Sequence, residues 1–146
     1  WEHRSGSKGD NLFLGSLLAL DAETGAYKWH YQETPSENWD FTSTQPIILT
    51  ELTLQGRKRK VLLHAPKNGF FYVVDRKDGQ LISAEPFTTV NWATGIDLKT
   101  GRPIEAPGAR YERTKKSFWA MPGPFGSHNW HPMAFSPKTG LTYIPV

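Results

Sequence analysis

The stretch ALDAETGAYKWHYQETPSENWD, from residue 19 to residue 40, contains the pattern A-x-D-x-x-T-G-x-x-x-W. This pattern predicts a strand, a polar turn and a second strand. Asp21 and Thr24 can hydrogen-bond the backbone of the turn, and Gly25 accepts a positive φ. Trp29 supplies a large flat apolar face on the second strand. The chain therefore contains at least one strand–turn–strand unit whose tryptophan serves packing.

The composition of the 146 residues fits an ordinary domain with short strands and many turns. Six Trp, eight Phe and five Tyr occur with thirteen Gly and eleven Pro. Cysteine is absent, which excludes a disulfide framework, a thiolate metal site and a thiol nucleophile. The net charge is +3, but Lys and Arg are scattered, and the single run, RKRK at 57–60, is expected to cap an exposed turn. We therefore expect no nucleic-acid partner.

Further strands are predicted from short apolar and β-branched runs separated by turn residues. Asn68-Gly69 gives the clearest hairpin signal, because it suits a tight turn between VLLHA and FFYVVD. The strands expected are 12–20, 26–32, 45–54, 60–64, 70–75, 80–84 and 141–146.

The polar turn of the opening stretch recurs along the chain. Asp97–Gly101 and Ser136–Gly140 repeat it, and RKDG at 76–79 is a third echo, with irregular spacing. The segment 102–128 is rich in Gly, Pro and basic residues and is expected to be a long loop. Because no segment of helical length shows helical periodicity, the chain is predicted to be all-β. On pattern alone a sandwich, a barrel and a propeller all remain open.

The ends of the sequence and its apolar runs bear on how it is organised. It opens at Trp1 without an initiating Met and stops within an expected strand, so it is expected to be an internal piece of a longer protein. No apolar run approaches the roughly 20 residues that a membrane-spanning helix needs.

Asp40 is the carboxylate that stands out, since Trp39 and Phe41 flank it between a loop and a strand. Aromatic neighbours create a low-dielectric setting in which a metal or a polar reactant interacts strongly with a carboxylate. From the residues alone, an aspartate that caps a turn is the more frequent role.

Other polar residues carry weaker signals. Lys67 lies in a turn, where a lysine is ordinarily solvated. His128 and His131 are three residues apart without a third ligand nearby, which is a weak zinc signal. His3, His30 and His64 have no partners in the sequence and are expected to be structural.

The A-x-D-x-x-T-G-x-x-x-W pattern resembles the tryptophan-docking motif of the quinoprotein alcohol dehydrogenases, the eight-bladed β-propellers that use pyrroloquinoline quinone (PQQ). The resemblance covers residues 1–146 and implies a partial PQQ-binding propeller domain. By the same resemblance Asp40 is the catalytic base and a metal ligand. Lys67 matches the basic residue that reaches the quinone oxygens. Asn129 matches an amide that contacts the cofactor, and Trp130 is a possible neighbour of its ring.

The resemblance also implies an activity: oxidation of small alcohols to aldehydes by hydride transfer to PQQ, with calcium as Lewis acid and Asp40 as general base. Lanthanide-using members carry a second aspartate two residues after the catalytic one, where this chain has Thr42, so calcium is expected. The implied partners are the alcohol and a cytochrome c or fused haem domain as electron acceptor, in the periplasm. The alternatives are a sugar- or polymer-oxidising quinoprotein and a non-catalytic propeller scaffold of the outer-membrane assembly type.

Overall fold

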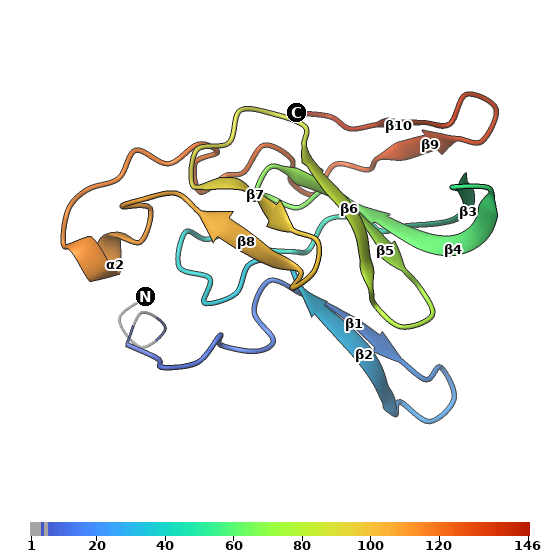
Figure 1. Cartoon of the computed structure of the whole chain (residues 1–146), viewed down its shortest axis with the longest axis horizontal. Coiled ribbons are helices and arrows are strands. Elements are labelled where there is room, and N and C mark those ends of the chain that lie inside the picture. The colour runs from blue at the N-terminus through green and yellow to red at the C-terminus, as the bar shows by residue number, and fades with distance from the viewer. Residues whose placement is uncertain (1–3, 5) are drawn as a thin grey trace.

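The computed structural model describes Arg4 and residues 6–146, and His3 lies outside the described residues. In this part of the chain ten strands form four antiparallel sheets, and a short helix, α2 (Tyr111–Thr114), lies apart from them (Figure 1). The strands are β1 (Ser16–Leu20), β2 (Tyr27–Gln32), β3 (Ile48–Leu54), β4 (Arg57–His64), β5 (Phe70–Asp75), β6 (Leu81–Pro86), β7 (Ala93–Asp97), β8 (Arg102–Glu105), β9 (Ala134–Ser136) and β10 (Leu141–Tyr143).

The largest sheet is a four-stranded meander with the order β3-β4-β5-β6. Two-stranded hairpins, β1-β2, β7-β8 and β9-β10, flank it in the sequence. A four-stranded antiparallel meander is the unit from which a propeller blade is built. The prediction of an all-β chain is confirmed.

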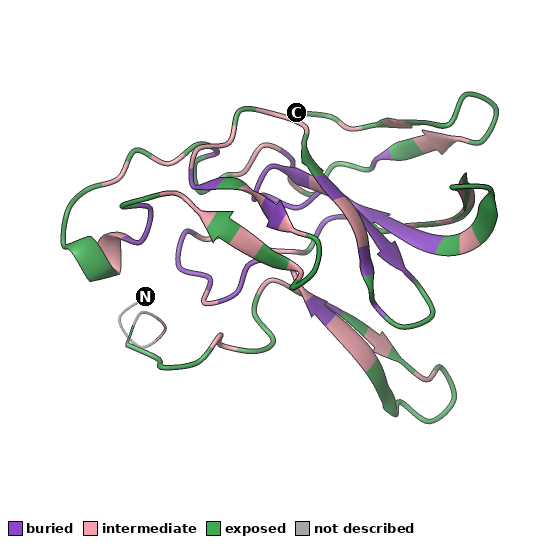
Figure 2. Cartoon of the chain, in the orientation of Figure 1, coloured by how far each residue is buried: buried purple, intermediate pink, exposed green. Residues whose placement is uncertain are grey.

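Buried side chains lie on both faces of the four-stranded sheet. Successive side chains of a strand point to opposite faces, so neighbouring residues belong to different clusters. Leu62 of β4 and Val74 of β5 belong to one buried cluster. Their neighbours Val61, Leu63 and Val73 belong to a second cluster, together with Phe135 of β9. Figure 2 shows the buried residues concentrated in the second half of β4, in β5 and in the loops beside them. The second half of β4 and the adjoining β5 are thus covered on both faces, as expected of a blade between two others.

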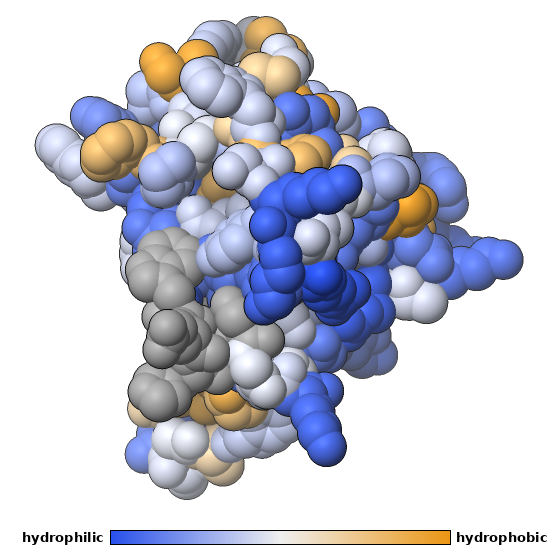
Figure 3. All heavy atoms as spheres, turned by 90° about the vertical axis from the view of Figure 1, so that its left-hand side faces the viewer, coloured by the Kyte–Doolittle hydropathy of each residue, from blue (hydrophilic) through white to orange (hydrophobic). Residues whose placement is uncertain are grey.

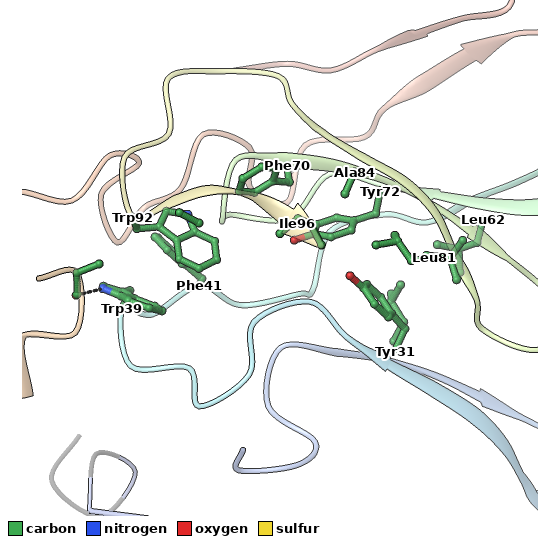
Figure 4. Close-up of a cluster of buried hydrophobic side chains, with 14 residues drawn as sticks. Tyr31, Trp39, Phe41, Leu62, Phe70, Tyr72, Leu81, Ala84, Trp92 and Ile96 are labelled. Carbon is green, nitrogen blue, oxygen red and sulfur yellow. Dashed lines mark hydrogen bonds between the residues drawn. The ribbon is translucent and has the colours of Figure 1, made fainter. Parts of the chain in front are cut away.

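The larger cluster is built around aromatic rings (Figure 4). The Trp92 ring is fully buried, and its centroid lies 5.0 Å from that of Trp39 and 5.6 Å from that of Phe41. The indole N–H groups are satisfied: Trp39 donates to Ala109 O and Trp92 donates to Asn68 O. Rings of this size supply much of the apolar area that a small sheet can bury.

The recurring polar turns share one backbone geometry. In each of them the N–H of the final glycine donates to the carbonyl four residues earlier, at 2.7–2.9 Å, and the glycine has φ between 70° and 77°. Side-chain oxygens of Asp21, Asp75 and Asp97 accept backbone N–H groups within their turns. The turns are residues 21–25, 75–79, 97–101 and 136–140.

Two of these turns receive an aromatic ring from β2. Trp29 packs on Gly79, where an added Cβ atom would lie 2.6 Å from Trp29 Cε3, and its indole N–H donates to Arg76 O. Tyr31 packs on Gly101, and its hydroxyl donates to Gly101 O. The predicted packing role of Trp29 is confirmed, and the glycines are needed because a side chain would occupy the space of the ring.

The Asn68-Gly69 hairpin is confirmed, with a longer connection than a two-residue turn. β4 and β5 pair antiparallel, with His64 opposite Tyr72, and residues 65–69 connect the strands. Gly69 has φ of 90°, and its N–H donates to Pro66 O at 3.4 Å. The extra residues form the loop that carries Lys67.

Several local predictions are wrong. Strands β7, β8 and β9 were not predicted, and residues 45–47 and 144–146 lie outside β3 and β10. The run at 57–60 does not cap a turn but forms the first half of β4, where Arg59 pairs with Asp75. Residues 12–14 are not part of β1 but form a turn before it, which is closed by a hydrogen bond from the Leu14 N–H to Asn11 O. Their side chains are exposed. The segment 102–128 is not loop throughout: it begins with β8 and contains α2.

Within the described residues, no helix is long and apolar enough to cross a bilayer. Figure 3 shows the face that carries α2, with hydrophilic residues in its middle and hydrophobic residues separated at its margins.

Candidate active site

Asp40 lies in a loop, residues 33–45, most of which is buried although it has no regular structure. Its neighbours Trp39 and Phe41 are 7% and 1% exposed, whereas the Asp40 side chain is 47% exposed. Asp40 has φ of 69°, a left-handed conformation that costs a non-glycine residue about 1–2 kcal/mol. Glu37 stabilises it by accepting the N–H of Phe41 at 2.8 Å. The loop thus buries the aromatic neighbours and leaves the carboxylate accessible.

Lys67 is brought to Asp40 by the β4–β5 connection. Its Nζ lies 3.8 Å from Asp40 Oδ2 and donates to the Asp40 backbone carbonyl at 3.2 Å. The lysine is only 8% exposed, so the solvated turn lysine expected from its position alone is wrong. Because a carboxylate and an ammonium meet at the edge of the core, both charges act on whatever binds beside them.

Gly126 holds the Lys67 side chain in this place. A Cβ atom on Gly126 would lie 2.6 Å from Lys67 Cβ and 2.7 Å from its Cα. The N–H of Ser127 also donates to Lys67 O at 3.4 Å. The segment with the two remaining predicted site residues therefore passes directly beside Lys67.

Asn129 and Trp130 themselves make local contacts. The Asn129 amide donates to Phe125 O, and Trp130 is 72% exposed and stacked on His131 at 4.2 Å between centroids. The structure therefore brings Asp40 and Lys67 into direct contact. Asn129 and Trp130 are linked to this pair only because the segment that contains them passes beside Lys67.

The weak zinc signal of His128 and His131 has a structural explanation. His128 is buried, and its ring nitrogens lie 2.6 Å from Ala65 O and 2.8 Å from His131 O. With both nitrogens on backbone carbonyls, this ring is not available to a metal. Among the described residues no group of three or more His, Cys, Asp or Glu side chains could hold a metal ion.

A buried polar network beneath the Lys67 loop was missed by sequence reasoning. Glu33 and His64 are each fully buried, and His64 Nδ1 lies 2.7 Å from Glu33 Oε1. His64 Nε2 lies 3.1 Å from Gln45 O. Next to Lys67, the Asn68 amide donates to Glu33 O, Thr34 Oγ1 and Tyr72 Oη. Glu33 lies 31 residues from His64 and 35 from Asn68, and no spacing pattern signals these contacts.

The charge state of His64 follows from this network. Burial lowers its pKa, but the Glu33 charge and the hydrogen bonds to Glu33 and Gln45 outweigh burial, so the pKa of His64 lies above its usual value. Both ring nitrogens face acceptors, which favours the doubly protonated ring. Glu33 Oε2 has no partner among the described residues.

Comparisons with known proteins show the family to which the chain belongs. Residues 2–91 match the family model described as "PQQ: Glucose/ethanol/alcohol dehydrogenase, beta-propeller domain". A curated relative, quinohemoprotein alcohol dehydrogenase ADH IIB of Pseudomonas putida, is 60% identical over 99% of this chain and 21% of its own length. The chain thus spans about one fifth of the length of the curated relatives that it matches.

Two solved structures share the fold. The crystal structure of quinohemoprotein alcohol dehydrogenase from Comamonas testosteroni is 59% identical, with a TM-score of 0.87 over 92% of this chain and 20% of its own. A europium-containing methanol dehydrogenase is 39% identical, with a TM-score of 0.82 over 91% of this chain and 23% of its own. With its fold, its docking turns and these matches, the chain belongs to the family of PQQ-dependent glucose, ethanol and alcohol dehydrogenase β-propeller domains.

Proposed function

We propose that the chain is part of the propeller domain of a longer PQQ-dependent alcohol dehydrogenase that oxidises small alcohols to aldehydes. The observation that carries this proposal is the meeting of Asp40 and Lys67, a half-exposed carboxylate with a buried ammonium 3.8 Å away. Family membership and the names of the relatives, alcohol dehydrogenases, support it.

The two side chains fit the groups that the family implies. A carboxylate oxygen is a ligand that calcium prefers, and the accessible Asp40 carboxylate can supply one. An ammonium group donates hydrogen bonds to carbonyl or phenolate oxygens, and Lys67 can do so. The described residues hold no complete metal site, so the other ligands would come from other parts of the longer protein.

Each residue then has a role in the reaction. PQQ, when bound, would accept the hydride that leaves the substrate carbon, and this hydride carries both electrons of the oxidation. Asp40 takes the proton of the alcohol hydroxyl, which leaves the aldehyde as product. Lys67 stabilises negative charge that develops on an oxygen beside it. A carboxylate next to a cation is a weak base, so the proton transfer to Asp40 is coupled to hydride loss from the substrate.

The test is Asp40→Asn in the full-length enzyme, because this change keeps the size of the side chain and removes the proton acceptor. Turnover is expected to fall about 10² to 10⁴ fold with PQQ bound. Asp78→Asn, in an exposed turn, is the matched control and keeps full activity. Turnover of Asp40→Asn within about threefold of the parent would show that Asp40 is not the base.

We propose calcium as the metal, on the basis of Thr42. This residue places a neutral hydroxyl where a second carboxylate would favour a trivalent ion, since a hard trivalent cation gains from each further anionic oxygen. Metal-stripped enzyme should regain activity with PQQ and calcium, and Thr42→Asp should shift the preference toward lanthanum. Activity restored in the parent by lanthanum but not by calcium contradicts the assignment.

The rest of the proposal concerns partners and location. The word quinohemoprotein in the names of two relatives supports a cytochrome c or a fused haem domain as electron acceptor. A periplasmic location follows from the family resemblance. Because the matched family includes glucose dehydrogenases, sugars are the second substrate class to test, by comparing kcat/KM for ethanol, 1-butanol and glucose.

A further inference from the structure

The loop that carries Asp40 is held by a segment far away in the sequence, residues 105–112, which we call the clamp. Trp39 Nε1 donates to Ala109 O at 3.1 Å (Figure 4). The Tyr111 hydroxyl donates to Asn38 O at 3.0 Å, and the Asn38 amide donates to Glu112 Oε2 at 2.7 Å. The clamp therefore binds both residues that precede Asp40, across about 70 positions of sequence.

Arg110 is the centre of the clamp. Its guanidinium donates to Pro35 O, Ser36 O and Asn38 Oδ1, and lies over the Trp39 ring with its central carbon 4.2 Å from the centroid. The side chain is 5% exposed. One buried cation thus contacts four of the five residues that lead into Asp40.

The burial of this charge is compensated by Glu105. Arg110 Nε donates to Glu105 Oε2 at 3.0 Å, and Nη2 donates to Glu105 Oε1. The guanidinium can serve a carboxylate, two carbonyls, an amide oxygen and a ring face together because its five donors lie in one plane. A lysine ammonium has three donors and no plane, so it cannot reproduce this set.

We propose that Arg110 is a positioning residue for Asp40, acting through the loop at 35–39. Asp40 has a left-handed backbone and a half-exposed side chain, so its carboxylate position depends on how firmly the preceding residues are held. Catalytic and metal-binding groups must be held to within a fraction of an ångström, and this precision comes from the residues that support them. This inference rests on the proposed function of Asp40.

The test is Arg110→Lys in the full-length enzyme, with Arg59→Lys as the matched control. Arg59 is also paired with a carboxylate, that of Asp75, but lies on β4 away from the Asp40 loop. Arg110→Lys is expected to lower kcat at least tenfold and to weaken calcium binding to the PQQ-loaded, metal-stripped protein at least tenfold. KM for the alcohol should change less than threefold, and Arg59→Lys should leave all three values unchanged.

A double-mutant cycle with Asp40→Asn shows whether Arg110 acts through Asp40. Asparagine replaces the charged ligand by a neutral amide oxygen that calcium binds more weakly, so most of the contribution of Asp40 is removed while calcium affinity stays measurable. If Arg110 acts through Asp40, adding Arg110→Lys to Asp40→Asn weakens calcium binding little further. Additive effects of the two changes would overturn the proposal.

A milder variant covers the case in which Arg110→Lys does not fold. Tyr111→Phe removes only the hydroxyl that donates to Asn38 O and should weaken calcium binding about threefold. If Asp40→Asn impairs turnover and calcium binding while Arg110→Lys and Tyr111→Phe impair neither, Arg110 is structural only. If Asp40→Asn impairs neither, it is the proposed function that fails.

Discussion

The contacts around an individual side chain determine how exposed it is and which groups it can act on. Lys67 is the clearest case: a residue in a turn is buried because Gly126 leaves room for its stem and the Asp40 carbonyl accepts from its ammonium. A lone cation next to developing negative charge in a dry site contributes on the order of 3 kcal/mol to a transition state. The same lysine in solvent would contribute little.

His64 connects the loop of Asp40 to the β4–β5 hairpin through Glu33 and makes stability depend on pH. The pKa of His64 in the folded protein lies above its usual value of 6.5, so its contribution to stability is complete below about pH 6.5 and is lost as the pH rises through the folded-state pKa. Parent protein should lose thermal stability as the pH rises above about 6.5, and His64→Gln should lose less over the same range. The measurement is Tm against pH, with His131→Gln, an exposed histidine, as control. Identical slopes for His64→Gln and the parent would contradict the prediction.

At the level of strands and turns, the chain uses one turn geometry for two purposes. The turn at 21–25 closes a hairpin, and its Gly25 has no atoms within 4 Å of an added Cβ. The turn at 75–79 has the same geometry but also receives the Trp29 ring on Gly79. The hairpin β1–β2 is thereby attached to the four-stranded sheet.

Alanine substitutions of the two glycines distinguish the energetic cost of backbone strain from the cost of lost packing. Gly25→Ala should lower the free energy of unfolding by about 1–2 kcal/mol, the cost of a left-handed alanine. Gly79→Ala should lower it by about 1–3 kcal/mol more, because its Cβ displaces the Trp29 ring. Chemical denaturation of both variants measures the difference. Equal losses would show that the Trp29–Gly79 contact contributes nothing to stability.

For the molecule as a whole, the site is open on the side of the Asp40 carboxylate. The described residues hold no metal cluster, and Trp119, Phe125 and Trp130 are each more than 70% exposed. The described residues therefore present Asp40, the carboxylate proposed as catalytic, at an open surface.

Residues 1–146 alone should accordingly not bind PQQ tightly. Binding requires metal ligands and ring contacts that the described residues lack, and a half-formed site gains little from one ammonium and one carboxylate. A fluorescence titration with PQQ and calcium measures this, with the full-length enzyme as positive control. Submicromolar, calcium-dependent binding by residues 1–146 would mean that the site is misplaced.

Local signals in the sequence were sufficient for β1 to β6, β10, the polar turns and the Asn68-Gly69 hairpin, because these depend on neighbouring residues, but they did not identify β7, β8 or β9. The prediction that residues 57–60 cap a turn was wrong, since charged residues on the exposed half of a strand resemble the charged residues of a turn. Asp40 was identified as a candidate from its aromatic neighbours and a family resemblance, and its catalytic role stays a prediction.

The contacts that define the site were decided by the tertiary structure alone. Asp40 and Lys67 are in contact although they are 27 residues apart in the sequence, and Glu33 and His64 are 31 residues apart. Arg110 contacts the loop at 35–39 from more than 70 residues away. Such pairs have no periodicity along the chain, because they come from loops whose paths follow the packing of Trp39, Phe41 and Trp92. The sequence by itself specified which groups are available, and packing of the sheets and loops determined which of them meet.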